Sequence, residues 1–162
     1  MRLRRKPWID EAIHDYDSHI ILSGQENYKG KWREAFSHPE RPLYMELGTG
    51  KGRFIAGMSE AHPDANFVGF EVQIGVIYYA AQKIFEAERD NAKVSLFDIA
   101  GIEEIVAPGE VDRFYINFCD PWPKAKHAKR RLTYHTFLDR YARLLKDNGE
   151  VHFKTDNEGL FM

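Results

Sequence analysis

Short runs of apolar residues, separated by polar turns, recur along the chain from residue 43 onward. Each run is brief and rich in aliphatic and aromatic side chains, which is typical of a buried β-strand. Four such runs and a fifth candidate predict strands at Leu43–Leu47, Asn66–Phe70, Val94–Phe97, Val111–Phe118 and Glu150–Lys154.

Apolar residues at helical spacing separate most of these strands. One stripe lies between Phe54 and Met58, a second runs from Val76 to Phe85, and a third runs from Tyr134 to Leu145 before Asn148–Gly149. Strand and helix therefore alternate, which predicts an α/β fold: a mostly parallel sheet with helices on both faces.

The two ends of the chain do not follow this alternation. Residues 1–40 contain Trp8 and Trp32 without a strand pattern, and we expect a basic, helical extension there, followed by a sheet domain over residues 41–162. Lys154–Asp156 reads as the end of a strand that would lie at an exposed edge, which natural proteins usually cover. We therefore expect the sheet domain to be incomplete at its C-terminal end.

Composition narrows the class of protein. A chain of 162 residues with 43% hydrophobic and 30% charged residues is neither disordered nor fibrous and suits one domain. No apolar run approaches the roughly 20 residues that span a bilayer, and the N-terminus lacks the apolar core of a secretion signal. Cys119 is the single cysteine, which excludes an internal disulfide and a cysteine zinc site. We expect a soluble, cytoplasmic protein without a metal site.

The positive charge is concentrated in two segments, although the net charge is only −2. Residues 1–6 and 124–131 are rich in lysine and arginine and contain no acid, whereas the rest of the chain has an excess of acids. Such clustering is typical of a protein that binds a polyanion, because cations that neutralise phosphates release counterions. A solvated basic face is the alternative for either cluster alone.

A glycine-rich segment, Glu46-Leu47-Gly48-Thr49-Gly50-Lys51-Gly52, follows the first predicted strand. Glycines there allow a sharp turn and a close approach of the backbone to a ligand, so we predict that Gly48, Gly50 and Gly52 bind a cofactor. The spacing differs from the Gly-x-Gly-x-x-Gly of dinucleotide-binding proteins. Glu46 could hold the ammonium of an amino acid. A tight turn without a ligand is the alternative.

Two further acids follow the next strands. Glu71 closes the second strand, where a carboxylate can accept hydrogen bonds from both hydroxyls of a ribose. Asp98 follows the third strand and could accept from an adenine amino group, although it could equally be an ordinary loop acid. An adenosine that carries an amino acid is S-adenosylmethionine, which is the cofactor we predict.

The fourth strand leads into Asn117-Phe118-Cys119-Asp120-Pro121-Trp122-Pro123-Lys124. Two prolines fix the backbone around Trp122. They present a carboxylate and an aromatic plane where open sheets bind ligands. An indole can stack on a nucleobase, and Asp120 can accept hydrogen bonds from guanine. A rigid structural turn is the alternative, and Cys119 is interpreted as a packing residue.

These motifs resemble the bacterial tRNA (guanine-N7-)-methyltransferase family. The resemblance runs from about residue 31 to the end and is carried by Glu46–Phe54, Asp120–Leu132 and Phe153–Phe161. It implies the Rossmann-like fold of class I S-adenosylmethionine-dependent methyltransferases. The family usually continues through a final pair of strands and a Thr-x-x-Glu segment, neither of which is present in this sequence.

The resemblance also implies roles for individual side chains. Glu46, Glu71, Asp98 and Asp120 would contact S-adenosylmethionine, and Asp120 would be the active-site acid. Lys124 and Asp156 would bind the substrate, a guanosine in the variable loop of tRNA. The segment that would lie against the RNA contains Lys126, His127, Lys129, Arg130 and Arg131.

Guanine N7 carries an in-plane lone pair and no proton, so its methylation requires no general base. We therefore expect Asp120 to orient the base and to stabilise the positive charge that the base gains.

Two other functions are compatible with parts of this sequence. A nicotinamide-dependent oxidoreductase would share the glycines and Glu71, but the glycine spacing is unfavourable to it. A non-catalytic tRNA-binding module of the same fold would bind RNA without methyl transfer. The residues do not decide between a monomer and a homodimer, nor which tRNAs are preferred.

Overall fold

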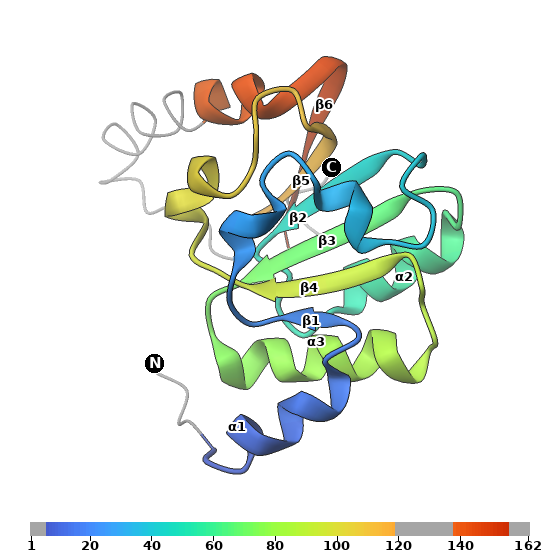
Figure 1. Cartoon of the computed structure of the whole chain (residues 1–162), viewed down its shortest axis with the longest axis vertical. Coiled ribbons are helices and arrows are strands. Elements are labelled where there is room, and N and C mark those ends of the chain that lie inside the picture. Colours follow the sequence, from blue (N-terminus) through green and yellow to red (C-terminus); the bar gives the residue numbers. More distant parts are fainter. Residues whose placement is uncertain (1–5, 119–137, 156–162) are drawn as a thin grey trace.

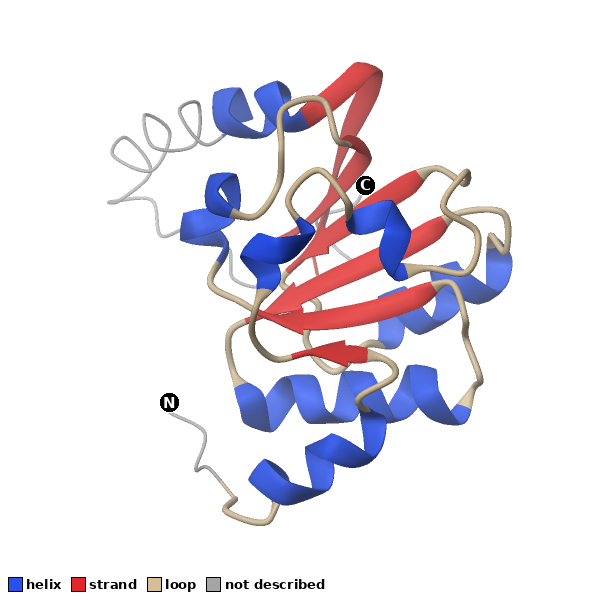
Figure 2. Ribbon diagram, in the orientation of Figure 1, coloured by secondary structure: helices blue, strands red, loops and turns tan. Residues whose placement is uncertain are grey.

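The computed structural model describes residues 6–118 and 138–155, which form a parallel sheet with helices on both faces (Figures 1 and 2). The sheet has six strands in the order β1-β4-β3-β2-β5-β6, and every neighbouring pair is parallel. The strands are Ile20–Ile21 (β1), Leu43–Leu47 (β2), Asn66–Glu71 (β3), Ala92–Leu96 (β4), Val111–Phe118 (β5) and Leu145–Thr155 (β6). The predicted α/β architecture is confirmed.

The helices alternate with these strands as the apolar stripes predict. The α-helices are α1 (Ile9–Ala12), α2 (Arg53–Ala61) and α3 (Ile74–Glu86), and residues 138–144 are also helical. Four 3₁₀ segments are η1 (Ile13–Tyr16), η2 (Gln25–Tyr28), η3 (Trp32–Ala35) and η4 (Ile99–Glu104). In the part of the chain that the structure describes, no helix has both the length and the apolar character needed to cross a bilayer.

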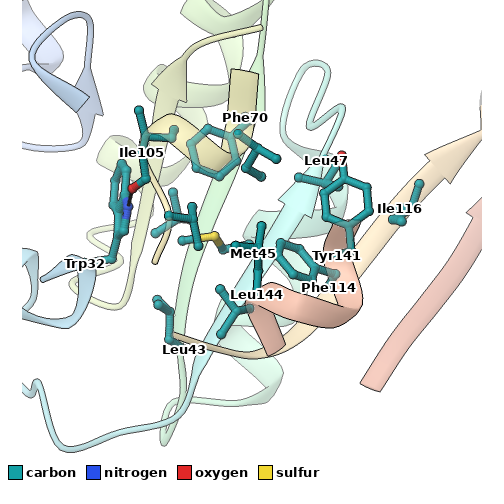
Figure 3. Close-up of a cluster of buried hydrophobic side chains, with 14 of the residues drawn as sticks. Trp32, Leu43, Met45, Leu47, Phe70, Ile105, Phe114, Ile116, Tyr141 and Leu144 are labelled. Carbon is teal, nitrogen blue, oxygen red and sulfur yellow. Dashed lines mark hydrogen bonds between the residues drawn. The ribbon is translucent and has the colours of Figure 1, made fainter. Parts of the chain in front are cut away.

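Two apolar clusters, one on each face of the sheet, hold these layers together. One cluster joins α1, α2 and α3 to the sheet through residues such as Ile55 and Ile77. The other lies beneath η4 and the helix over residues 138–144, where Trp32, Phe70 and Tyr141 pack on the strands (Figure 3). Because both faces of the central strands are covered, β2 and β3 are buried almost throughout rather than at alternate positions.

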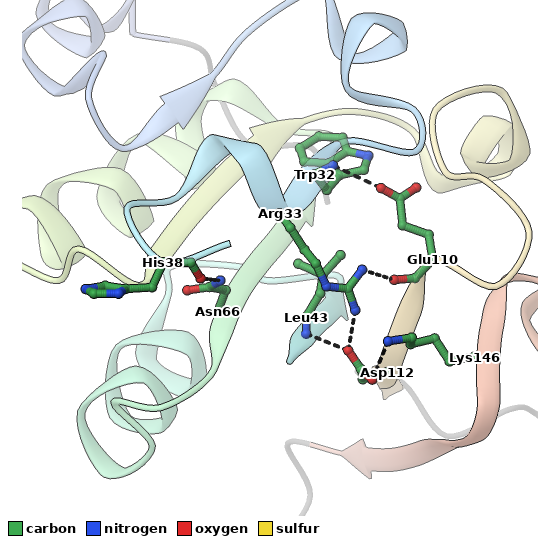
Figure 4. A network of polar contacts seen from close by, with 8 residues as sticks. All are labelled: Trp32, Arg33, His38, Leu43, Asn66, Glu110, Asp112 and Lys146. Atoms are coloured by element: carbon green, nitrogen blue, oxygen red, sulfur yellow. Dashed lines mark hydrogen bonds and ion pairs between the residues drawn. The ribbon is translucent and has the colours of Figure 1, made fainter. Parts of the chain in front are cut away.

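The N-terminal segment contributes to this core. The Trp32 side chain is fully buried, and its indole N–H donates to the carbonyl of Ile105 at 2.7 Å. The carboxylate of Glu110 accepts hydrogen bonds from the backbone N–H groups of Gly30 and Trp32. Figure 4 shows the adjoining network, in which Arg33 pairs with Asp112. We expected only helices and loops in residues 1–40, so the two-residue strand β1 departs from the prediction.

The last strand begins earlier than the sequence pattern predicts. Leu145 already pairs with Val111, and the register then shifts before Arg113 pairs with Glu150. Asn148 has a left-handed backbone, with φ of +70°, inside this irregular stretch. Asn148–Gly149, which the sequence pattern placed after the end of a helix, instead lies inside β6 at an irregularity, and pairing with β5 occurs on both sides of it.

Candidate active site

The order of the strands reverses at β2, which lies between β3 and β5. In open parallel sheets, ligands bind at the carboxyl ends of the strands beside such a reversal. Glu46 lies near the end of β2, Glu71 ends β3, and Asp98 follows β4. Because the strands are parallel, these three acids lie at the same edge of the sheet, toward which the arrowheads point in Figure 2.

The glycine loop is bound to the end of β3 through its backbone. The N–H groups of Gly48 and Thr49 both donate to the carbonyl of Phe70, at 2.9 and 2.8 Å. Gly52 has φ of +86°, and a Cβ there would lie 2.7 Å from Cα of Ala80 in α3, so only glycine fits. Gly50 also has a left-handed backbone, but a Cβ there would meet nothing within 4 Å. One glycine therefore packs against a helix, whereas the other borders open space.

The carboxylate of Glu46 lies beneath this loop and is only 3% exposed. The Thr49 hydroxyl, which is also buried, donates a hydrogen bond to it. Sequence reasoning missed Thr49. Its signal is the spacing of three residues from Glu46, which allows a hydroxyl in the turn to reach back to a carboxylate on the strand. A buried carboxylate held in this way favours a cationic ligand group.

Glu71 links the end of β3 to the loop. Its Oε1 accepts from the N–H of Gly50 at 3.0 Å, and its Oε2 accepts from the N–H groups of Val72 and Gln73, both at 3.1 Å. These hydrogen bonds fix the orientation of the carboxylate, and each oxygen has lone pairs for a further donor. The side chain is half-buried, so ligand hydroxyls can reach it from the open side.

Asp98 is exposed and has a local structural role as well. Its Oδ1 accepts from the N–H of Ala100 at 3.0 Å and so caps η4. Nearby, Val72 is 60% exposed directly beside Glu71. Sequence reasoning also missed Val72, whose signal is an apolar residue placed just outside a buried strand. Asp98 and Val72 therefore give this edge of the sheet a hydrogen-bond acceptor and an exposed apolar surface.

The remaining predicted site residues lie outside the described part of the chain and stay predictions. This holds for Asp120, Lys124, Lys126, His127, Lys129, Arg130, Arg131 and Asp156. The strands that lead to them are described: Phe118 at the end of β5 pairs with Thr155 at the end of β6. The described ends of β5 and β6, which precede these residues in the sequence, therefore lie side by side at the carboxyl edge of the sheet.

Comparison with known proteins gives a consistent result. The sequence model of a family described as "Putative methyltransferase" matches residues 40–162 of this chain. The tRNA (guanine-N(7)-)-methyltransferase of Bacillus licheniformis is 47% identical over 161 residues, which is 99% of this chain and 75% of that relative. The protein of the same name from Streptococcus agalactiae is 45% identical with the same coverage.

Solved structures with a similar fold are also methyltransferases. The antibiotic-resistance methyltransferase Kmr matches with a TM-score of 0.57 at 23% identity, over 72% of this chain and 59% of that one. Coclaurine N-methyltransferase, solved with SAH bound, matches with a TM-score of 0.55 at 16% identity, over 68% of this chain and 30% of that one. At these identities the likeness concerns the fold, which is that of class I S-adenosylmethionine-dependent methyltransferases.

The sequence relatives are much closer than these structures, and they span nearly the whole chain. On that ground, the protein belongs to the tRNA (guanine-N7-)-methyltransferase family, as its motifs predict.

Proposed function

We propose that this protein transfers the methyl group of S-adenosylmethionine to N7 of a guanosine in the variable loop of tRNA. The observation that carries the proposal is the meeting of Glu46, the glycine loop and Glu71 at the point where the strand order reverses. The names of the close relatives support the substrate class.

The donor set at this edge fits an adenosine that carries an amino acid. Glu46 would hold the ammonium, Glu71 would accept from the ribose hydroxyls, and Asp98 would accept from the adenine amino group. The open space beside Gly50 and the exposed apolar surface of Val72 suit close contact with a ligand. When bound, the sulfonium of this cofactor supplies an electrophilic methyl group.

The protein's own task is to position the acceptor base. Guanine N7 has no proton to remove, so orientation dominates, and well-oriented reactants can lower a barrier by about 7–11 kcal/mol. Asp120 would orient the guanine through its N–H groups and stabilise the positive charge that the base gains in the transition state.

Substrate binding must also offset the cost of unstacking the guanine, which is about a few kcal/mol. The cations between Lys124 and Arg131 would supply contacts to phosphates, and Lys124 and Asp156 would contact the target nucleotide.

The test is transfer of labelled methyl from S-adenosylmethionine to unmodified bulk tRNA, with the product nucleoside identified after digestion. We expect 7-methylguanosine. A different methylated nucleoside would refute the assigned target atom. Affinity for tRNA without any methyl transfer would refute the enzymatic function and favour a binding module. Asp120→Asn should keep most of its cofactor affinity and lose most turnover, so an active Asp120→Asn variant would contradict the role given to this acid.

A further inference from the structure

A cluster of lysine and aromatic side chains lies where the N-terminal segment meets α3. Lys6 Nζ donates to the hydroxyl of Tyr79 at 3.4 Å, and Lys51 Nζ lies 5.5 Å from the centroid of the same ring. Trp8 packs edge-on against Tyr78 with ring centroids 5.2 Å apart. Figure 1 shows α1 beside α3, which brings this start of the chain next to the helix.

The two lysines share one tyrosine and carry net positive charge into solvent. Both side chains are exposed, and neither forms an ion pair with a carboxylate among the residues that the structure describes. Tyr79 is half-buried and provides a neutral hydroxyl for Lys6 and a ring face for Lys51. The tyrosine therefore holds two ammonium groups near each other without neutralising them, which favours an anionic ligand.

An exposed aromatic side chain completes this surface. Trp8 is 49% exposed although it contacts Tyr78, and it stands two residues from Lys6. Proteins that bind single-stranded nucleic acid combine cations for the backbone with exposed aromatic rings on which bases stack. An exposed indole beside two uncompensated ammonium groups has this composition.

The same surface adjoins the candidate active site through the glycine loop. Lys51 lies between Gly50, whose N–H binds Glu71, and Gly52, which packs on Ala80. Lys51 extends from this loop to the ring of Tyr79 in α3. Because Lys51 belongs to the glycine loop, an RNA strand bound by Lys51 would lie beside the loop that is proposed to face the cofactor.

We propose that Lys6, Trp8, Lys51 and Tyr79 form a second RNA-binding surface, which holds the tRNA strand that flanks the methylated guanosine. Lys6 and Lys51 bind phosphates and Trp8 stacks on an unpaired base. This inference rests on the proposed function and assigns RNA contacts separate from those predicted between Lys124 and Arg131. The concentration of cations in residues 1–6 agrees with a polyanion at this surface.

The test compares Lys6→Ala, Lys51→Ala and the double variant with a matched control, Lys31→Ala. Lys31 is exposed and lies between two residues whose amides bind Glu110, at the opposite, amino edge of the sheet. Dissociation constants for unmodified tRNA are measured over a range of salt concentrations. Each phosphate contact contributes close to one unit of slope, so each substitution should weaken binding about fivefold at about 0.15 M salt and flatten the slope by about one unit. Lys31→Ala should leave both quantities unchanged.

Three further measurements keep the inference falsifiable. Lys51→Arg retains the charge and should restore binding, whereas a role in packing would not be rescued by charge. Trp8→Phe should bind better than Trp8→Ala. Lys6→Ala and Lys51→Ala should both bind the cofactor with unchanged affinity when RNA is absent. If Lys51→Ala weakened cofactor binding but not tRNA binding, Lys51 would bind the carboxylate of the cofactor, and the inference would be overturned.

Failure of the second RNA-binding surface can be distinguished from failure of the proposed function. If the unchanged chain forms no 7-methylguanosine, the proposed function fails. If it forms this product and the lysine variants bind tRNA with unchanged affinity and salt slope, only the second RNA-binding surface is refuted.

Discussion

Replacement of Gly52 by alanine should damage the structure and the site together. The backbone at Gly52 has φ of +86°, a left-handed conformation that costs a residue with a Cβ about 1–2 kcal/mol. The new Cβ would lie 2.7 Å from Cα and 2.8 Å from Cβ of Ala80. Both atoms belong to Ala80, which is fully buried in α3, so the loop or the helix must move.

The contact adds to the backbone cost. Extra methyl groups in packed regions typically cost about 1–3 kcal/mol, so Gly52→Ala should lower the free energy of unfolding by about 2–5 kcal/mol. Moving the loop away from α3 would also shift Gly50 relative to Glu71, whose hydrogen bond of 3.0 Å orients the carboxylate. We therefore expect weaker cofactor binding as well as lower stability.

Two other glycines separate these effects. Gly109 has φ of +71° with nothing within 4 Å of the position that a Cβ would occupy, and it precedes β5 at the amino edge of the sheet. Gly109→Ala should therefore show the backbone cost alone, about 1–2 kcal/mol, with normal cofactor affinity. Gly50→Ala should lose a similar amount of stability, but its methyl group would enter the open space beside the loop and reduce cofactor affinity.

Urea denaturation followed by circular dichroism measures the stabilities, and calorimetric titration with S-adenosylmethionine measures the affinities. The expected order of stability places Gly52→Ala below both other variants. If Gly52→Ala were no less stable than Gly109→Ala, the close packing of the loop on α3 would be refuted. If Gly50→Ala bound the cofactor normally, the loop would not face the ligand in the way proposed.

Three other predictions follow from the structure. Glu71→Gln should weaken cofactor binding in the same titration, whereas Asp64→Asn, an exposed acid before β3, should not. Trp32→Ala should lower the free energy of unfolding by about 3–5 kcal/mol in urea, because it empties a fully buried position and leaves the carbonyl of Ile105 without its 2.7 Å donor. Burial lowers the pKa of His19 below its ordinary value of 6.5. The unfolded chain therefore binds the proton more readily, and stability should fall as the pH drops below 6.5. His19→Gln should reduce this loss of stability in melting experiments, and an unchanged pH profile would contradict the role given to His19.

Local pattern was sufficient to predict most of the sheet. β2 and β5 begin and end at the residues predicted from their apolar runs. Both strands are paired on both sides, and most of their described residues are buried, so their apolar residues cluster in runs that are visible without the fold. β4 and β6 were less well predicted, because their ends depend on pairing: Ala92 joins β4 opposite Phe67, and Leu145 joins β6 opposite Val111.

The positions of Glu71 and Asp98 at one edge of the sheet were predictable for a related reason. Glu71 and Asp98 follow strands of a predicted parallel sheet, and parallel strands bring their carboxyl ends to one edge. The glycine loop could be recognised because its backbone geometry depends on residues that are adjacent in the sequence. The individual roles of these side chains toward a ligand stay predictions, as does the role of Asp120.

The fold class, the central strands, the glycine loop and the family can be inferred from the amino-acid sequence, because each depends on local composition or on a contiguous motif. Four other features became visible only in the folded chain: the strand order, the insertion of Trp32 into the core, the packing of Gly52 on Ala80 and the contacts of Lys6 and Lys51 with Tyr79. These features join residues that are far apart in the chain. Their energies depend on which surfaces become buried together, and no local pattern of hydrophobic and polar residues carries that information.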